Sequence, residues 1–162
     1  MIAPGSLLWR YLSPTQQQLA TDGQLLVDDW EQHHVKELSD YSYLVFPFAK
    51  LYEGFLKQLF RDLDIITERE YQSANFRVGK VLSPNLVRRL GHRSAYGHLA
   101  KRYSTTLAER LWNTWKQGRN LVFHYFPHNL RRLSFVEANE IIAMIETSMM
   151  EAIEEMRPQK KD

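Results

Sequence analysis

Apolar side chains recur every three or four residues over most of this chain, which is the spacing of an amphipathic α-helix. The strongest run spans residues 40–66, and its repeating positions are Leu44, Phe48, Leu51, Phe55, Leu59 and Leu63. Three further residues widen the apolar face, which implies contacts on more than one side: Phe46, Leu56 and Phe60. We expect a central helix here, with Asp40 as its N-cap and with Pro47 bending it or delaying its start.

Two other helices are indicated by their first residues. Ser13 and Gln16 flank a proline at the first helical position, and together they predict a helix over about 14–38, although a glycine at position 23 weakens it. Ser134 and Glu137 form the same kind of capping box and open a final helix that runs to about residue 156.

The pattern changes between these helices. Periodicity fades over 67–104, where glycine and proline are frequent, and we expect exposed, mobile loops and short helices, one of them with Pro84 in its first turn. Helical spacing resumes at Leu107 and ends near Pro127, so that Gly118 falls inside this helix.

The elements therefore predict an all-α fold, a helical bundle of about four long helices with an irregular segment between the second and third. We expect one domain over 1–162, with a core from about 13 to 156 and short flexible ends. A chain of 162 residues can bury such a core without disulfides.

Composition excludes several classes of protein. With no cysteine, disulfide scaffolds, thiol catalysis and thiolate metal sites are ruled out, and the expectation is a cytoplasmic protein. No secretory signal and no long apolar window is evident, so export and membrane insertion are not expected.

Charge is distributed unevenly, although the formal net charge is only +2. No acidic residue lies between Glu70 and Glu109, while that stretch holds seven fixed cations: Arg77, Lys80, Arg88, Arg89, Arg93, Lys101 and Arg102. We interpret these as a surface that binds RNA; the alternative is a solvated connection that its charges keep soluble.

One stretch carries candidate chemistry. In "GRNLVFH", Arg119 is followed by Asn120 and then, five positions after the arginine, by His124. Residues five apart lie about 140° apart around an ideal helix, so the pair does not share one face unless the helix is distorted near Gly118. Arg93 has a histidine at the same spacing, but without the asparagine, and we treat that match as accidental.

The arginine, the polar residue after it and the spaced histidine resemble the HEPN superfamily of all-α domains. "DYSYLVFPFAKLYEGFLKQLF" followed by "GRNLVFH" is similar to the HEPN-type domain of the RNase LS toxin family, over residues 40–128. The resemblance implies that Asp40 and Glu53 match the acidic residues of that site. It also implies a homodimer with a composite cleft, RNA as substrate and a cognate antitoxin protein, in a version without the toxins' additional N-terminal domains.

The resemblance implies a metal-independent endoribonuclease that needs no cofactor. His124 would be the general base or acid, because an unperturbed histidine titrates near neutrality, and Arg119 would stabilise charge on phosphorus. Asn120 would orient the histidine, the substrate or the other protomer, and Glu53 would hold Arg119. The products would carry a 2′,3′-cyclic phosphate and a 5′-hydroxyl.

Other interpretations remain open. The chain could be a non-catalytic HEPN module that binds RNA, a nucleotide or a partner protein, or a purely structural helix bundle. Asp40 could simply cap a helix, Glu53 could form a salt bridge, and His124 with His128 has the spacing of a metal-binding pair that Pro127 would disrupt. Three aromatic residues exceed what a narrow bundle seam needs and favour a dimer: Trp112, Tyr125 and Phe126.

Overall fold

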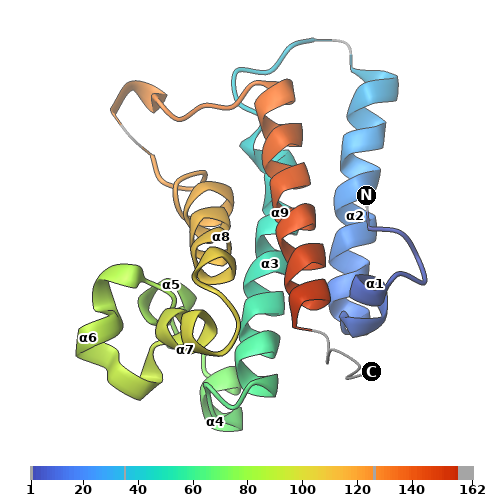
Figure 1. Cartoon of the computed structure of the whole chain (residues 1–162). Helices are drawn as coiled ribbons and strands as arrows, with labels where there is room; N and C mark the ends of the chain where they lie inside the picture. The colour runs from blue at the N-terminus through green and yellow to red at the C-terminus, as the bar shows by residue number, and fades with distance from the viewer. Residues whose placement is uncertain (1, 35, 126, 157–162) are drawn as a thin grey trace.

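The computed structural model describes residues 2–34, 36–125 and 127–156, and within those ranges it is all-helical, without strands (Figure 1). The predicted all-α fold is confirmed. The elements are α1 (Leu7–Tyr11), α2 (Pro14–His33), α3 (Ser42–Asp62), α4 (Glu68–Gln72), α5 (Val78–Val81), the 3-10 turn η1 (Pro84–Leu86), α6 (Val87–Leu90), η2 (Gly91–Arg93), α7 (Ala95–Arg102), α8 (Thr105–Trp115), the π turn η3 (Lys116–Asn120), η4 (Pro127–Asn129) and α9 (Phe135–Glu155). In the described part of the chain, no helix combines the length and the apolar character needed to cross a bilayer.

The long helix α3 lies at the centre and packs against α2 and α9, while α8 packs against both α3 and α9 (Figure 1). As the apolar spacing predicted, α3 is buried along most of its length, and Leu56 and Phe60 have no exposed surface. Phe46 differs, because 53% of its side chain is exposed. Its apolar surface is therefore not used by the core.

Helices α2 and α3 approach each other closely at Gly23. A Cβ atom at this position would lie 2.7 Å from the ring of Phe48, so only glycine fits without repacking. The predicted capping box of Ser13 and Gln16 is confirmed. The helix ends at His33 rather than near 38, because the chain must turn there to bring α3 back along α2; Val35 lies outside the described residues.

The start of α3 is fixed by the segment that precedes α9. The N-cap is Tyr41 rather than Asp40, and the N–H of Tyr41 donates to the carbonyl of Leu133 over 2.9 Å. The Asp40 carboxylate accepts from the N–H groups of Ser42 and Leu133. These bonds anchor the first turn, so α3 begins before Pro47, and the delayed start that was one of the two predicted effects of Pro47 does not occur.

The segment 77–102, which we call the basic segment, folds into the short helices α5, α6 and α7, as predicted. It is not wholly exposed, which corrects the other part of that prediction: Val78, Leu82 and Leu99 are buried. A Cβ at Gly79 would overlap the ring of Trp115, which shows how closely α5 packs against α8.

The helix that begins at Thr105 changes its winding before the predicted end near Pro127. It is α-helical to Trp115 and then opens into a π turn, in which the N–H of Leu121 donates to the carbonyl of Lys116 over 2.9 Å. Gly118 lies in this turn, and a Cβ there would be 2.9 Å from Ile145 of α9. The wide turn and the missing side chain let the chain pass close to α9 before it leaves the helix.

The two ends of the chain complete the core. Residues Ile2, Leu8 and Leu12 are buried, so the core begins before the predicted position 13, and α1 packs against α9. No sequence pattern predicted α1, because its five residues are too few to show a helical period. The capping box that opens α9 is confirmed. The predicted flexible C-terminal end falls on residues 157–162, outside the described residues.

Candidate functional site

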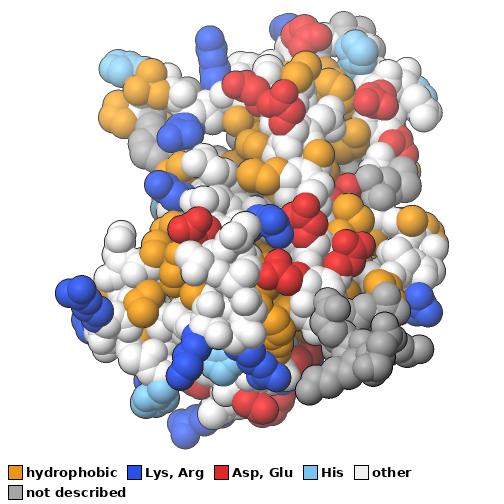
Figure 2. All heavy atoms as spheres, in the orientation of Figure 1, with side chains coloured by type: hydrophobic (Ala, Val, Ile, Leu, Met, Phe, Trp, Pro, Cys, Tyr) orange, Lys and Arg blue, Asp and Glu red, His pale blue; other side chains and the backbone are white. Residues whose placement is uncertain are grey.

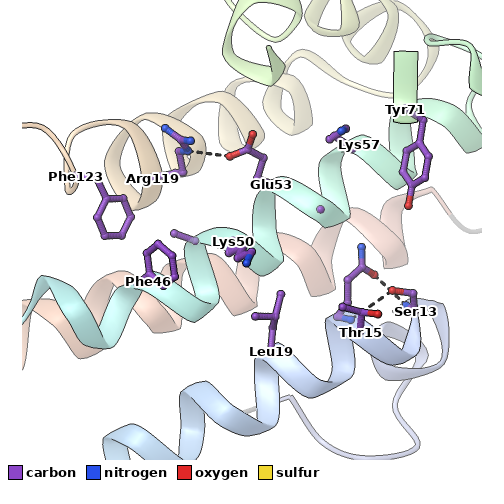
Figure 3. Close-up of a pocket in the computed structure, with 13 residues that line it drawn as sticks. Ser13, Thr15, Leu19, Phe46, Lys50, Glu53, Lys57, Tyr71, Arg119 and Phe123 are labelled. Atoms are coloured by element: carbon purple, nitrogen blue, oxygen red, sulfur yellow. Dashed lines mark hydrogen bonds and ion pairs between the residues drawn. The ribbon is translucent and has the colours of Figure 1, made fainter. Parts of the chain in front are cut away.

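Arg119 and Glu53 meet where the π turn crosses the middle of α3. The Nε atom of Arg119 donates to Oε2 of Glu53 over 2.9 Å, and the two side chains are 40% and 32% exposed (Figure 3). Because this bond uses Nε, it does not occupy the two terminal nitrogens, which are the donors that suit a phosphate. The structure thus brings together two of the predicted site residues.

His124 and Asn120 form a second pair on the same connection. Nε2 of His124 lies 3.1 Å from Oδ1 of Asn120, and His124 is exposed. An amide oxygen can only accept, so Nε2 carries the hydrogen of this bond, and in the neutral ring Nδ1 is then the basic nitrogen. Asn120 therefore sets the tautomer of His124.

The two pairs differ in their relation to the nearby pocket. Arg119 lines a pocket, whereas His124 is not among the residues that line it. The chain leaves the helix after Asn120, so the 140° separation expected for a regular helix does not apply. Within one chain, Arg119 is held by Glu53 and His124 by Asn120, each with its own partner.

The pocket beside Arg119 has a volume of about 780 Å³ and lies between α2, α3, α4 and η3. Its walls are formed by Ser13, Thr15, Gln16, Leu19, Phe46, Ala49, Lys50, Glu53, Gly54, Lys57, Tyr71, Arg119 and Phe123. Figure 3 shows Phe46 and Phe123 at one end, Tyr71 with Ser13 and Thr15 at the other, and the Arg119–Glu53 pair between them. The volume is in the range of pockets that hold small organic ligands.

The structure places Asp40 apart from this pocket, which it does not line. The Asp40 carboxylate binds backbone groups at the start of α3. Helix α3 rises about 1.5 Å per residue, so Glu53 lies about 16 Å along the axis from Ser42. A single chain therefore does not gather Asp40 with Glu53 and Arg119.

The seven predicted RNA-binding cations lie on the short helices and at their ends, and basic side chains appear along the edge of this part of the molecule in Figure 2. Arg88 and Arg89 on α6 are exposed, and so are Lys101 and Arg102 at the end of α7. The remaining three line a smaller hollow of about 270 Å³: Arg77, Lys80 and Arg93.

Arg93 is not an isolated cation, because its guanidinium forms an ion pair with Glu70 of α4. Glu70 also accepts from the N–H and the hydroxyl of Thr67. The bond from the Thr67 N–H, with further contributions from its hydroxyl and Arg93, holds the pKa of Glu70 below its usual value. Arg93 therefore contributes less positive charge to the surface than the sequence suggested.

Several pocket residues were missed by the sequence analysis, although the sequence contains a signal for them. Phe46, Lys50 and Lys57 lie on the same helical face as the predicted Glu53, and the four follow one another at intervals of four, three and four residues. A charged stripe on a helix that is otherwise buried marks the side on which a ligand can approach. The contribution of Phe123 depends on the π turn, and no sequence pattern indicated that turn.

The three aromatic residues expected to favour a dimer have different surroundings. Trp112 stacks on Trp115 with ring centroids 5.6 Å apart and is partly buried. Tyr125 is 80% exposed. Phe126 lies outside the described residues. Tyr125 is thus available for contact with a partner.

Metal binding has no support in the part of the chain that the structure describes, where no group of three or more histidine, aspartate or glutamate side chains could hold an ion. His124 and His128 do not share a helix, and His128 has a φ of 61° in the left-handed region. Comparisons of this chain with family models, curated proteins and solved structures find no match.

Proposed function

We propose that this chain is a HEPN-type, metal-independent endoribonuclease that acts as a homodimer. The proposal includes a HEPN-like bundle formed by α2, α3, α8 and α9. The observation that carries it is the π turn, which holds Arg119 against Glu53 on a pocket wall and is followed by His124 with its tautomer set by Asn120. π turns are rare and recur at functional sites.

The chemistry requires only these side chains. Nδ1 of one His124 removes the proton of a ribose 2′-hydroxyl, and the 2′-oxygen then bonds to the adjacent phosphorus. The bond from phosphorus to the 5′-oxygen breaks, and that oxygen takes a proton from an acid. Arg119 stabilises the charge on the phosphoryl oxygens. The products are a 2′,3′-cyclic phosphate and a 5′-hydroxyl, and no water or metal enters this step.

The dimer would supply what a single chain lacks. Because Arg119 and His124 face different partners within one chain, a second copy would bring its own His124 to the cleft as the acid. Tyr125, Leu130 and the exposed part of Phe123 would give such an interface apolar surface next to the catalytic residues.

The setting of this activity follows from the family resemblance. We propose a cytoplasmic toxin of a bacterial toxin–antitoxin or phage-defence system, restrained by an antitoxin protein. The basic segment would guide RNA to the cleft through its exposed cations. Among them, Arg88 and Arg89 are separated from the nearest acidic residue by the largest number of sequence positions.

A second candidate is a non-catalytic HEPN module that binds RNA, a nucleotide or a partner protein. The separate hydrogen bonds of Arg119 and His124 favour it, because each residue already has a structural partner. In that case Arg119 would fasten η3 to α3, and replacing it would destabilise the fold instead of slowing a reaction.

The ends of the RNA products test the leading proposal. Cleavage of a labelled single-stranded RNA should give 5′-hydroxyl ends that a kinase can phosphorylate directly and 3′ ends that resist phosphatase until acid opens the cyclic phosphate. Fragments with 5′-phosphate ends would contradict the mechanism, because water or a metal-bound hydroxide would then be the nucleophile. Absence of cleavage together with RNA binding would favour the second candidate.

A further inference from the structure

The pocket beside Arg119 is larger than phosphate chemistry requires, and its two ends differ. At one end the rings of Phe46 and Phe123 meet edge to face, with centroids 5.7 Å apart (Figure 3). Both residues keep exposed surface, 53% for Phe46 and 39% for Phe123. Their contact with each other therefore leaves ring surface for a flat ligand, and an aromatic ring in such a position suits a nucleobase.

Cationic groups surround these rings. Lys50 lies one helical turn after Phe46 on α3, Arg119 faces Phe46 from η3, and Lys57 lies further along the same face of α3. Glu53 is the one carboxylate among the lining residues, so the lining carries a net positive charge. Cations beside an exposed aromatic ring provide both contacts that an RNA strand offers, a base to stack and a phosphate to pair.

The ammonium of Lys57 already makes a cation–π contact, because its nitrogen lies over the Tyr71 ring, 5.6 Å from the ring centroid. Lys50, in contrast, is exposed at the Phe46 end. A phosphate next to a base stacked on Phe46 would thus meet Lys50 and Arg119 first.

We propose that this pocket receives one unpaired base of a single-stranded RNA, stacked on Phe46 and Phe123, with the flanking phosphates on Lys50 and Arg119. The inference rests on the proposed function and adds the substrate class: the strand must be unpaired where it enters. A base within a duplex is stacked and paired, so it cannot reach a ring inside a pocket between α2 and α3 unless it leaves the helix. Ala49 and Gly54 are among the lining residues with the smallest side chains, and Gln16 packs next to Gly54.

Binding of a non-cleavable RNA tests this inference separately from catalysis. The probe is a short, fluorescently labelled single strand whose 2′-hydroxyls are methylated, titrated with the full chain and followed by anisotropy. Phe46→Ala should weaken binding by about 5- to 100-fold, the range that stacking of a base supports. Tyr43→Ala is the matched control, because Tyr43 is a similarly exposed ring on α3 that does not line the pocket, and it should change affinity less than about twofold.

A second variant, which changes the charge of the pocket, shows whether the effect of Phe46→Ala comes from lost binding or from a change in the fold. Lys50→Glu should also weaken binding, whereas Lys36→Glu, at an exposed lysine outside the pocket, should do so much less. The same label on a fully paired RNA should bind the wild-type chain no better than it binds the Phe46→Ala variant.

The outcomes separate the inference from the proposed function. Affinity that is unchanged by Phe46→Ala and Lys50→Glu in folded variants overturns the base pocket, even if the wild-type chain cleaves RNA. Equal affinity for paired and unpaired RNA overturns it as well. Loss of binding in both variants supports the pocket even if no RNA is cleaved, and in that case only the catalytic proposal fails.

Discussion

The Nε atom of Arg119 lies 2.9 Å from Oε2 of Glu53, although the two residues are 66 positions apart in the sequence. This bond joins the π turn η3 to the middle of the central helix α3 and fixes where the guanidinium enters the pocket (Figure 3). Because both side chains are partly exposed, the pair contributes little to stability, and its arrangement serves the position of Arg119.

Glu53→Gln should therefore reduce RNA cleavage far more than it reduces stability. The amide keeps the size of the side chain but loses the charge that holds Arg119, and we expect the cleavage rate to fall by about tenfold or more. The free energy of unfolding should change by less than about 1 kcal/mol. Single-turnover cleavage and urea unfolding measure the two quantities, with Glu140→Gln as an exposed control on α9. A large loss of stability with normal cleavage per folded molecule would assign the pair a structural role.

Gly118→Ala should destabilise the protein, because the added Cβ would lie 2.9 Å from Ile145. We expect a loss of about 1 to 3 kcal/mol, typical of overpacking in a core. Ile145→Ala removes the atoms that would clash, so the double variant should lose less stability than the sum of the two single variants. Strict additivity in urea unfolding would show that Gly118 is not needed for the approach of η3 to α9.

The sequence predicted the helices better than their irregularities. Capping boxes at Ser13 and Ser134 depend on neighbouring residues, so their positions could be predicted directly. The π turn depends on the contact between Gly118 and Ile145, which lie on different helices, and no local pattern encodes that contact. For the same reason, the pairing of Arg119 with Glu53 was expected from a resemblance, while the pocket between α2 and α3 was not foreseen.

Tyr52→Phe should make the free energy of unfolding less sensitive to alkaline pH, because it removes a buried hydroxyl group. The Tyr52 hydroxyl donates to the carbonyl of Leu111 over 3.0 Å and lies 3.3 Å from the hydroxyl of Ser148, joining α3 to α8 and α9. Replacing it should cost about 0.5 to 1.5 kcal/mol at neutral pH.

Burial raises the pKa of Tyr52 above its ordinary value of about 10. The unfolded chain therefore releases this proton at a lower pH than the folded chain, so stability is complete below about pH 10 and declines as the pH rises above it. Urea unfolding at a series of pH values should show a shallower alkaline decline in the variant. Burial also raises the pKa of Tyr11, so some decline should remain. Parallel curves for the two proteins would contradict the assignment to Tyr52.

Charge reversal at Arg88 and Arg89 should lower the affinity for RNA and make that affinity less dependent on salt concentration. Each phosphate contact with a single strand contributes about 0.7 to the slope of log affinity against log salt, so losing two contacts should reduce the slope by about 1.4. Anisotropy titrations over a range of salt concentrations measure this change. Reversal of Arg10 and Lys36, exposed cations outside the basic segment, is the control for net charge. An unchanged slope in the Arg88 and Arg89 variant would leave α6 without a role in binding RNA.

The most direct test of the central proposal is cleavage of a labelled single-stranded RNA in excess chelator by the wild-type chain and by His124→Ala. His124 is exposed, so the variant should keep its thermal stability and its RNA affinity. We expect cleavage by the wild-type chain without metal and a rate at least about 100-fold lower in the variant, the loss typical of a general acid–base residue. Cleavage that stops when metal is removed, or that proceeds at the wild-type rate in His124→Ala, would contradict the proposal.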